Sequence, residues 1–324
     1  MSFAQAMADT ATHRRHLLLG NGFSMSIHGG FRYGSLFEEA ARIDNGIVPL
    51  FAGHGADFEA AIGAASSAED QDRIRSAFIR AISKVHPKRK YLSVEARIAC
   101  GRFLEQFAGV ERAELRGSVF TTNYDLLLYW VLMQRKQALK MYDGFDNYGV
   151  WSSARVWNSY VFYLHGALHL YEVPRGMVPP GMEQQKLLWR EDATLIDQVR
   201  ANLRTGRFPL FVSEGGPDSK LRRIGRNPYL KRVRRKFREV TKSANTSLFV
   251  VGHSLADVDS HITDVIGEGS ADVYLGVFNG DDETRARRVV ATWAQRRQDL
   301  GNGPLSVRLF KSAECPIWTE PTAD

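Results

Sequence analysis

Cysteine is nearly absent from this 324-residue sequence, in which only Cys100 and Cys315 occur. Two cysteines cannot build a disulfide framework, and they cannot form a four-cysteine zinc site. We expect both thiols to be buried as small apolar side chains and to have no chemical role. No low-complexity tract and no internal repeat is present either, which argues against a disordered chain or a solenoid.

The sequence also has no long apolar run. None approaches the roughly 20 residues that a membrane-crossing helix needs, and the first 16 residues contain no continuous apolar stretch like that of a signal peptide. With 44% hydrophobic and 24% charged residues, the composition is that of an ordinary globular protein. We therefore expect a cytoplasmic protein without membrane contact.

Positive charge is concentrated in one segment. The formal net charge is +7, yet the segment from Lys220 to Lys242 alone holds eleven basic residues and one acid, Glu239. Its apolar residues recur at helical spacing, so we predict a helix with a solvated basic face. An acidic partner subunit is a second interpretation and nucleic acid a third. Nucleic acid as a direct substrate is disfavoured because few aromatic residues lie between the charges.

Apolar runs typical of strands alternate with helical patterns, which predicts the α/β class. We expect a Rossmann-like, mostly parallel sheet of about six strands, into which a helical cap domain is inserted. The expected strands lie at residues 16–19, 118–120, 160–163, 208–212, 247–251 and 273–278, with an extended run at 305–310 closing an edge.

The predicted organisation has three parts. Residues 1–15 are expected as an N-terminal tail, and residues 16–30 with 110–324 as the Rossmann-like domain. Residues 31–109 are expected as a helical insertion because amphipathic patterns recur throughout them. Two further insertions, 140–159 and 171–206, are expected to be irregular, and a helix is expected from Tyr124 to about Gln137.

The first motif that carries chemistry is Gly20-Asn21-Gly22-Phe23-Ser24, which follows the first apolar run. Glycines where a strand gives way to a helix let the backbone approach a pyrophosphate. Ser24 could cap the helix or bind a phosphate. Taken alone the motif is weak, since such glycines also occur in ordinary tight turns.

The second motif is Thr121-Thr122-Asn123-Tyr124-Asp125. Two threonines already supply capping groups, so Asn123 is better explained as an amide that holds a sugar hydroxyl or a water. Asp125 is equally well explained as a carboxylate at a helix start, where the helix dipole favours negative charge.

The third motif is His165-Gly166, which follows a strand. An imidazole can accept a proton near neutral pH, which suits a base acting on water or a ribose hydroxyl. His169 lies four residues further on, but no Cys, Asp or Glu occurs before Glu172, so we expect no metal site.

Two downstream strings end later strands. Ser213-Glu214-Gly215-Gly216 ends one, and Gly252-His253-Ser254-Leu255 ends the next. Ser254 and Asp257 match a capping-box spacing, and Asp259 could open the following helix. Gly252 and Ser254 could also line a pocket for adenosine.

The order of these five strings resembles that of the sirtuin superfamily, and more closely its bacterial sirtuin-like NAD-cleaving branch of antiphage defence. The resemblance implies that Gly20, Gly22 and Ser24 hold the pyrophosphate of NAD. It implies that Asn123 and Asp125 bracket the nicotinamide ribose and carboxamide, that His165 is the base, and that Gly252 and Ser254 touch the adenosine half. Asn21, Thr122 and Glu214 belong to the same motifs and are counted with the NAD-binding residues.

The zinc-binding cysteines of sirtuin deacylases are absent, and Gly30 stands where their cofactor loop has an acid. The resemblance therefore favours an NAD+ glycohydrolase, which releases nicotinamide and ADP-ribose, over a lysine deacylase. A hydrolase of NAD must be gated, so a homo-oligomer and a partner ATPase or another activating subunit are expected. Two alternatives stay open: a non-catalytic sensor of NAD or an ADP-ribose derivative, and a nucleic-acid-processing effector.

Overall fold

The computed structural model describes residues 1–89, 92–153, 160–174, 176–179, 182–190 and 192–319. Six parallel strands form the main sheet in the order β3-β2-β1-β6-β7-β8. Their bounds are β1 Arg14–Leu19, β2 Val119–Thr121, β3 Val161–Tyr163, β6 Thr246–Val251, β7 Asp272–Val277 and β8 Val307–Lys311. The α/β class, the parallel sheet and its six strands are confirmed, and β8 closes an edge as expected.

One expected strand does not form. Residues 208–212 contribute only an isolated bridge, in which Phe211 pairs antiparallel with Gly166. Here the chain runs along the loop that follows β3, and the amide of Val212 donates to the carbonyl of His165. The prediction of a strand at 208–212 was therefore wrong, because an apolar run that is buried against a loop has the same sequence pattern as a buried strand.

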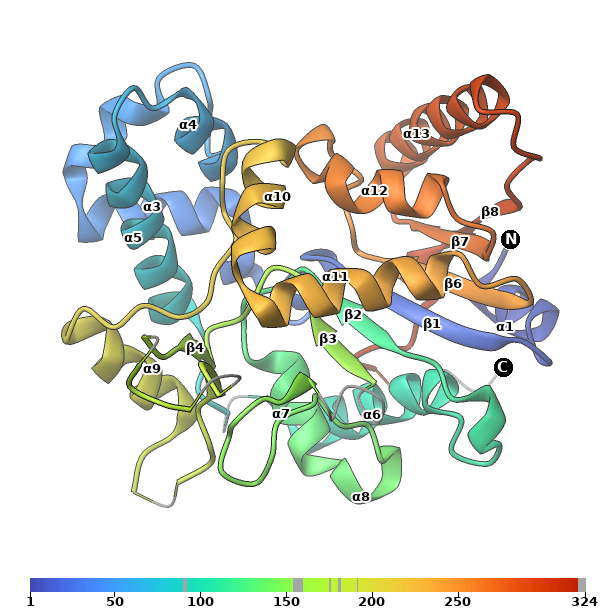
Figure 1. Cartoon of the computed structure of the whole chain (residues 1–324), viewed down its shortest axis with the longest axis horizontal. Coiled ribbons are helices and arrows are strands. Elements are labelled where there is room, and N and C mark those ends of the chain that lie inside the picture. Colours follow the sequence, from blue (N-terminus) through green and yellow to red (C-terminus); the bar gives the residue numbers. More distant parts are fainter. Residues whose placement is uncertain (90–91, 154–159, 175, 180–181, 191, 320–324) are drawn as a thin grey trace.

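Apolar side chains cover both faces of the sheet. In the register, Phe120 shares a row with Leu18, whereas Phe249 shares a row with Leu17, so the two phenylalanines point to opposite faces. Phe120 packs on Phe237 of helix α11 (Pro228–Thr241), at 4.9 Å between ring centroids. Phe249 packs on Phe107 of helix α6 (Val94–Ala108), at 5.5 Å. Figure 1 shows α11 crossing one face of the sheet.

The inserted helices form two groups. Helices α3, α4 and α5 lie together beside the sheet, at the upper left of Figure 1, whereas α6 contacts β1. Residues 31–109 begin at the last residue of η1 (Gly29–Phe31). They contain α3 Tyr33–Ile43, η2 Asn45–Phe51, α4 Phe58–Ala64, α5 Ala68–Val85 and α6. Residues 1–15, expected as a tail, include α1 (Phe3–Asp9), whose buried Phe3 contacts the rings of Phe249 and Phe310.

The remaining elements connect the strands. The expected helix from Tyr124 begins later, as α7 (Leu127–Gln134), so Asp125 precedes the helix. Residues 171–206 are more regular than expected, since they contain most of a small antiparallel pair of strands and a helix. In chain order the further elements are α2 Gly22–Met25, η4 Ala113–Leu115, α8 Lys136–Leu139, β4 Leu170–Glu172, β5 Gln184–Lys186, α9 Leu195–Arg204, α10 Pro217–Arg226, η6 Asp257–Asp259, α12 Ser260–Gly267, α13 Gly280–Asp299 and η7 Ser312–Glu314.

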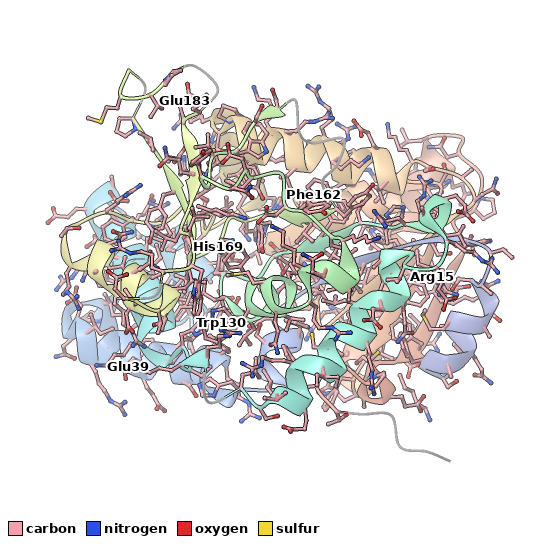
Figure 2. All side chains as sticks on the ribbon, turned by 90° about the horizontal axis from the view of Figure 1, so that it is seen from below. Arg15, Glu39, Trp130, Phe162, His169 and Glu183 are labelled. Atoms are coloured by element: carbon pink, nitrogen blue, oxygen red, sulfur yellow. The ribbon has the colours of Figure 1, made fainter. Side chains whose placement is uncertain are left out.

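Residues 154–159 of the expected insertion 140–159 lie outside the described residues. So do residues 175, 180–181 and 191 of the expected insertion 171–206. Seen from below in Figure 2, Glu39 and Glu183 lie toward the periphery, whereas His169 lies in the interior. Both cysteines are buried as expected. No described helix has both the length and the apolar character required to span a bilayer.

Candidate active site at the carboxyl ends of the strands

A cavity of about 860 Å³ lies at the carboxyl ends of β1, β2, β3 and β6. The strand order changes direction here. Strands β2 and β3 lie on one side of β1, and strands β6, β7 and β8 lie on its other side. Such switch points are where open α/β sheets bind ligands. Nine of the eleven predicted site residues line this cavity: Gly20, Asn21, Gly22, Thr122, Asn123, Asp125, His165, Gly252 and Ser254. Ser24 and Glu214 do not.

The glycines at this edge let two turns touch. A Cβ on Gly20 would lie 2.5 Å from the Cα of His253, and one on Gly22 would lie 2.6 Å from the Cα of Gly252. The amides of Gly20 and Gly22 donate to the carbonyls of Val251 and Gly252, at 3.0 and 2.8 Å. These two N–H groups are therefore already bonded, so a phosphate at this turn has to be held by other groups.

Ser24 and Asp125 are buried beside Asn123 and orient its side chain. The hydroxyl of Ser24 donates to Oδ2 of Asp125, so its oxygen accepts from Nδ2 of Asn123, at 2.9 Å. Oδ1 of Asp125 accepts from the amide of Leu127, at 2.8 Å. These hydrogen bonds fix the orientation of the Asn123 amide, because they identify which terminal atom is the nitrogen. The other terminal atom is therefore Oδ1. That oxygen is buried and has no hydrogen-bond partner among the residues that the structure describes.

Asp125 therefore has a more specific position than a helix-start carboxylate. It is buried, and burial raises the pKa of its carboxyl, although the hydrogen bond from Ser24 works in the opposite direction. Its contact with Ser24 joins it to the Asn123 amide. The structure thus makes Asp125 a support for Asn123, in addition to its bond with the start of α7.

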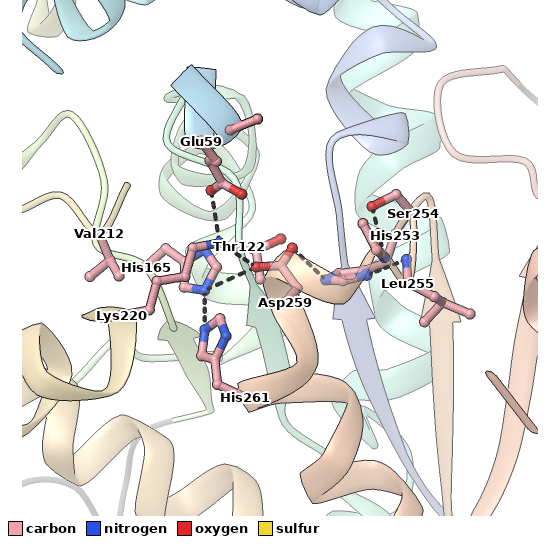
Figure 3. Close-up of polar contacts among 12 residues, drawn as sticks. Glu59, Thr122, His165, Val212, Lys220, His253, Ser254, Leu255, Asp259 and His261 are labelled. Atoms are coloured by element: carbon pink, nitrogen blue, oxygen red, sulfur yellow. Dashed lines mark hydrogen bonds and ion pairs between the residues drawn. The ribbon is translucent and has the colours of Figure 1, made fainter. Parts of the chain in front are cut away.

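His165 lies at the end of β3 and is 2% exposed. Its Nε2 is 2.8 Å from Nε2 of His261 and 3.9 Å from Oδ1 of Asp259, as Figure 3 shows. Burial lowers the pKa of His165 well below its usual range, and the charge of Asp259 opposes that shift. The imidazole is therefore neutral near pH 7 and keeps a lone pair on one ring nitrogen, and the lowered pKa makes it a weaker base than an exposed histidine.

Asp259 is the centre of a buried network of charged groups and imidazoles. Its Oδ1 is 2.7 Å from the ammonium of Lys220, which is also 2.8 Å from Oε1 of Glu59, and its Oδ2 is 3.7 Å from Nε2 of His253. Burial disfavours the charge of Asp259, but the attraction and the hydrogen bond of the Lys220 ammonium oppose burial, and the pKa of Asp259 is lowered. The pKa of Lys220 is raised, because its two carboxylate partners outweigh burial.

Five residues of this network were not among the predicted site residues: Asp259, Lys220, Glu59, His261 and His253. Asp259 was interpreted only as a helix start, and Lys220 only as part of the basic segment. Lys220 is fully buried, however, and lies four residues before Ile224 on the buried face of α10, a spacing visible in the sequence. Nothing in the sequence marks Glu59 or His261, because their partners come from distant elements.

The other predicted residues are placed as follows. Glu214 lies away from the cavity, and burial raises its pKa. The capping box of Ser254 and Asp257 does not form, since Ser254 accepts only from the amide of Ala256, at 3.4 Å. Nδ2 of Asn21 donates to the carbonyl of Phe31, at 3.1 Å.

One group of described side chains has the spacing of metal ligands: His165, Asp259 and His261, whose ligand atoms lie within 4.8 Å of one another. The ammonium of Lys220 already binds the same carboxylate, at 2.7 Å, and a metal ion there would meet its positive charge. We therefore assign no metal to this group. His169 is no part of it, since its ring stacks on Tyr129 with 4.1 Å between centroids.

The basic segment folds as α10 and α11. The expected helical face is confirmed, with Leu230, Val233, Phe237 and Val240 buried. Among the charged residues of α11, Lys231, Arg235 and Arg238 are exposed, whereas Arg234 is about half buried. The role of the basic segment Lys220–Lys242 as a contact surface stays a prediction.

Two buried histidines outside the site have fixed tautomers. Nδ1 of His16 accepts from the amide of Ser118, at 2.9 Å. Nε2 of His86 accepts from the amide of Leu126, at 2.9 Å, while its Nδ1 contacts the carbonyl of Pro87. Protonating either accepting nitrogen breaks its hydrogen bond. Burial lowers the pKa of both side chains to about 3.

We expect the free energy of unfolding to fall as the pH drops below about 6.5, the pKa of an unfolded histidine. Because the folded-state pKa lies below that value, the unfolded chain binds the proton at a higher pH than the folded chain does. The contribution of these histidines to the free energy of unfolding is therefore fully present above pH 6.5 and is lost as the pH falls toward 3. Each such histidine contributes a slope of up to about 1.4 kcal/mol per pH unit. Urea unfolding at pH 7.5, 6 and 5 measures it, and an unchanged midpoint contradicts the prediction.

The fold and the cavity define a Rossmann-like α/β protein with a strand-end site at the switch point. The family model described as "Domain of unknown function (DUF4917)" matches residues 17–318, so the chain belongs to that family. No curated protein matches the sequence.

Two solved structures are similar at low identity. One is a Sir2 variant with deacetylated p53 peptide and 3′-O-acetyl ADP ribose, at 13% identity and a TM-score of 0.40. The other, described as the structural basis for sirtuin substrate affinity, has 13% identity and a TM-score of 0.39. Each match covers 94% of this chain and 100% of the other. Likenesses this distant transfer no activity to this chain.

Proposed function

We propose that this protein is an NAD+ glycohydrolase, which cleaves the bond between nicotinamide and ribose. One observation carries the proposal: Asn123, whose buried amide oxygen has no hydrogen-bond partner among the described residues, lines the same cavity as the neutral imidazole of His165. An unpartnered buried acceptor is costly unless a ligand or water supplies a donor. A ribose hydroxyl or the attacking water is such a donor.

The reaction needs an oriented substrate, a water and a base. The bond between C1′ of the ribose and the nicotinamide nitrogen breaks, and its electron pair goes to the nicotinamide, which thereby becomes neutral. The oxygen of water bonds to C1′, and His165 takes one of its protons and later releases it to solvent. Because nicotinamide leaves without protonation, one base suffices.

The charge of the cavity suits this reaction. Positive charge develops on the ribose as nicotinamide leaves. Asp259 and Glu59 line the cavity and face one ammonium, that of Lys220. Burial raises the pKa of Glu59 to about 7, so this carboxyl is partly ionised near neutral pH. A carboxylate near a developing cation lowers the barrier.

The phosphates of NAD require positive groups elsewhere. Among the described residues that line the cavity, Arg32 and Arg285 carry the guanidinium groups. Arg285 lies in the second turn of α13 and donates to the carbonyl of Ser254, at 3.2 Å. We assign these two residues to the pyrophosphate, because the amides of Gly20 and Gly22 are already bonded.

Incubating the purified protein with NAD and separating the products by chromatography tests the proposal. Release of nicotinamide together with ADP-ribose, free or cyclic, supports it. Binding of NAD without release of nicotinamide overturns it in favour of a sensor module. If the protein neither binds nor cleaves NAD, and binds DNA or RNA with an affinity that falls as the salt concentration rises, the nucleic-acid effector is favoured.

We also propose that the activity is gated, in a cytoplasmic setting of antiphage defence, because an unregulated hydrolase would deplete the NAD of its own cell. Assembly into a homo-oligomer or contact with an activating ATPase would supply the gate. The exposed basic residues of α11 are the surface to test, by reversing the charge of Lys231, Arg235 and Arg238 together.

A further inference from the structure

Two ring nitrogens in the site face each other with only one hydrogen between them. Nε2 of His165 and Nε2 of His261 are 2.8 Å apart, which is the distance of a hydrogen bond. Both imidazoles are buried and neutral, so exactly one of the two nitrogens carries the hydrogen and the other accepts it. The tautomer of His165 is therefore tied to that of His261.

The position of Asp259 decides which nitrogen carries the hydrogen. Its Oδ1 lies 3.9 Å from Nε2 of His165, too far for a hydrogen bond but close enough for attraction. A carboxylate favours the N–H dipole on the nearest ring nitrogen. This attraction favours the hydrogen on Nε2 of His165, with Nε2 of His261 as its acceptor; the Nδ1–H of His261 is then buried and has no hydrogen-bond partner among the described residues. Nδ1 of His165 is left with its lone pair.

We propose that His261 and Asp259 are positioning residues, which fix His165 in the tautomer whose Nδ1 is the base and stabilise the imidazolium that forms when it takes a proton. The expected effect on kcat rests on the proposed hydrolysis of NAD, whereas the tautomer of His165 does not depend on that activity. The same division of roles, in which a second group holds an imidazole in one tautomer, occurs in hydrolases with a catalytic triad.

Among the described residues, four charged or titratable groups act on the charge of His165, each from a different element, and the titratable ring of Tyr124 stacks on it with 6.3 Å between centroids. Asp259 comes from η6, His261 from α12, Lys220 from α10 and His253 from the loop after β6. Only Asp259 attracts a positive imidazole, while Lys220 and the other two histidines disfavour it. Glu59 from α4 acts on His165 through Lys220, which it holds at 2.8 Å. Removing the charge of Asp259 therefore makes His165 a weaker base.

The first experiment compares Asp259→Asn with wild-type protein in NAD cleavage over pH 3.5 to 9, a range that extends well below the usual histidine pKa because burial lowers the pKa of His165. We expect kcat to fall at least about 10-fold with little change in KM, and the acidic limb of the kcat profile to move to lower pH. Lys220 keeps Glu59 as a partner in this variant, so folding is preserved. Asp257→Asn, in the same short helix but outside the cavity, is the matched control. A loss of kcat with an unmoved acidic limb would overturn the role of Asp259.

The second experiment is independent of turnover. Long-range ¹⁵N–¹H spectra of histidine-labelled protein report which ring nitrogen carries hydrogen. We expect the Nε2–H tautomer for His165, its loss in His261→Leu, and partial recovery in His261→Gln, whose amide oxygen can accept the same hydrogen. The Nδ1–H tautomer in wild-type protein would overturn the inference. The Nε2–H tautomer in a protein that does not cleave NAD would instead overturn the proposed function alone.

Discussion

His165→Ala is expected to lower kcat for NAD cleavage by about 10²- to 10⁴-fold, because the attacking water loses its base. That range corresponds to about 3–5 kcal/mol in the activation free energy. Binding of NAD should change much less, since other residues of the cavity are proposed to hold the phosphates and the adenosine half. Nicotinamide release in single-turnover reactions measures the loss, and titration calorimetry measures the affinity.

Asn123→Ala is the companion variant, and a loss of similar size is expected, because the water or the ribose hydroxyls lose their acceptor. His165 and Asn123 are both buried, so each variant must first show the wild-type circular dichroism and thermal unfolding. His54→Ala, a change outside the cavity, is the control for a lost imidazole. A folded His165→Ala protein with wild-type turnover would remove His165 from the mechanism.

Lys220→Met is expected to lower the free energy of unfolding by about 3–5 kcal/mol, because it leaves two carboxylates without their shared cation. Lys220 is 0% exposed, and its ammonium lies within 2.8 Å of both Glu59 and Asp259. Glu59 can relieve the repulsion by taking up a proton, so the loss should be smaller at pH 6 than at pH 8. Urea unfolding at the two pH values measures both effects.

Lys231→Met, on the exposed side of the neighbouring helix, is the matched control and should change stability by less than about 0.5 kcal/mol. The double variant Lys220→Met with Glu59→Gln should regain part of the lost stability, because one of the two stranded charges is gone. Equal stability of Lys220→Met and wild-type protein would mean that the buried network contributes nothing to folding.

The sheet was predictable because each of its strands is an apolar run next to a glycine or polar turn, as at residues 16–19 and 247–251. That Asn123 and His165 line one cavity was predictable for the same reason, since parallel strands bring their carboxyl ends to one edge. The false strand at 208–212 has the same apolar pattern, and only its tertiary surroundings distinguish it.

The network around Asp259 was not predictable, because its members come from α4, α10, η6 and α12 and pair only after folding. Lys220 illustrates the difficulty. In the sequence it is one of eleven basic residues in a segment that predicts a solvated surface, yet its ammonium is enclosed by two carboxylates. Charge patterns describe the average face of a helix, whereas a single buried residue depends on its partners.

The pairing of β1 has a consequence for how the chain matures. This strand emerges first from the ribosome, but its neighbours follow much later: His16 bonds to Ser118, 102 positions away, and His13 to Ser247, 234 positions away. Contacts this remote form slowly. The cavity at the strand ends, which needs the turn after β6 and the side chain of Trp318, is therefore completed only when nearly the whole polypeptide has been synthesised, and a nascent or truncated chain ending before β6 lacks it.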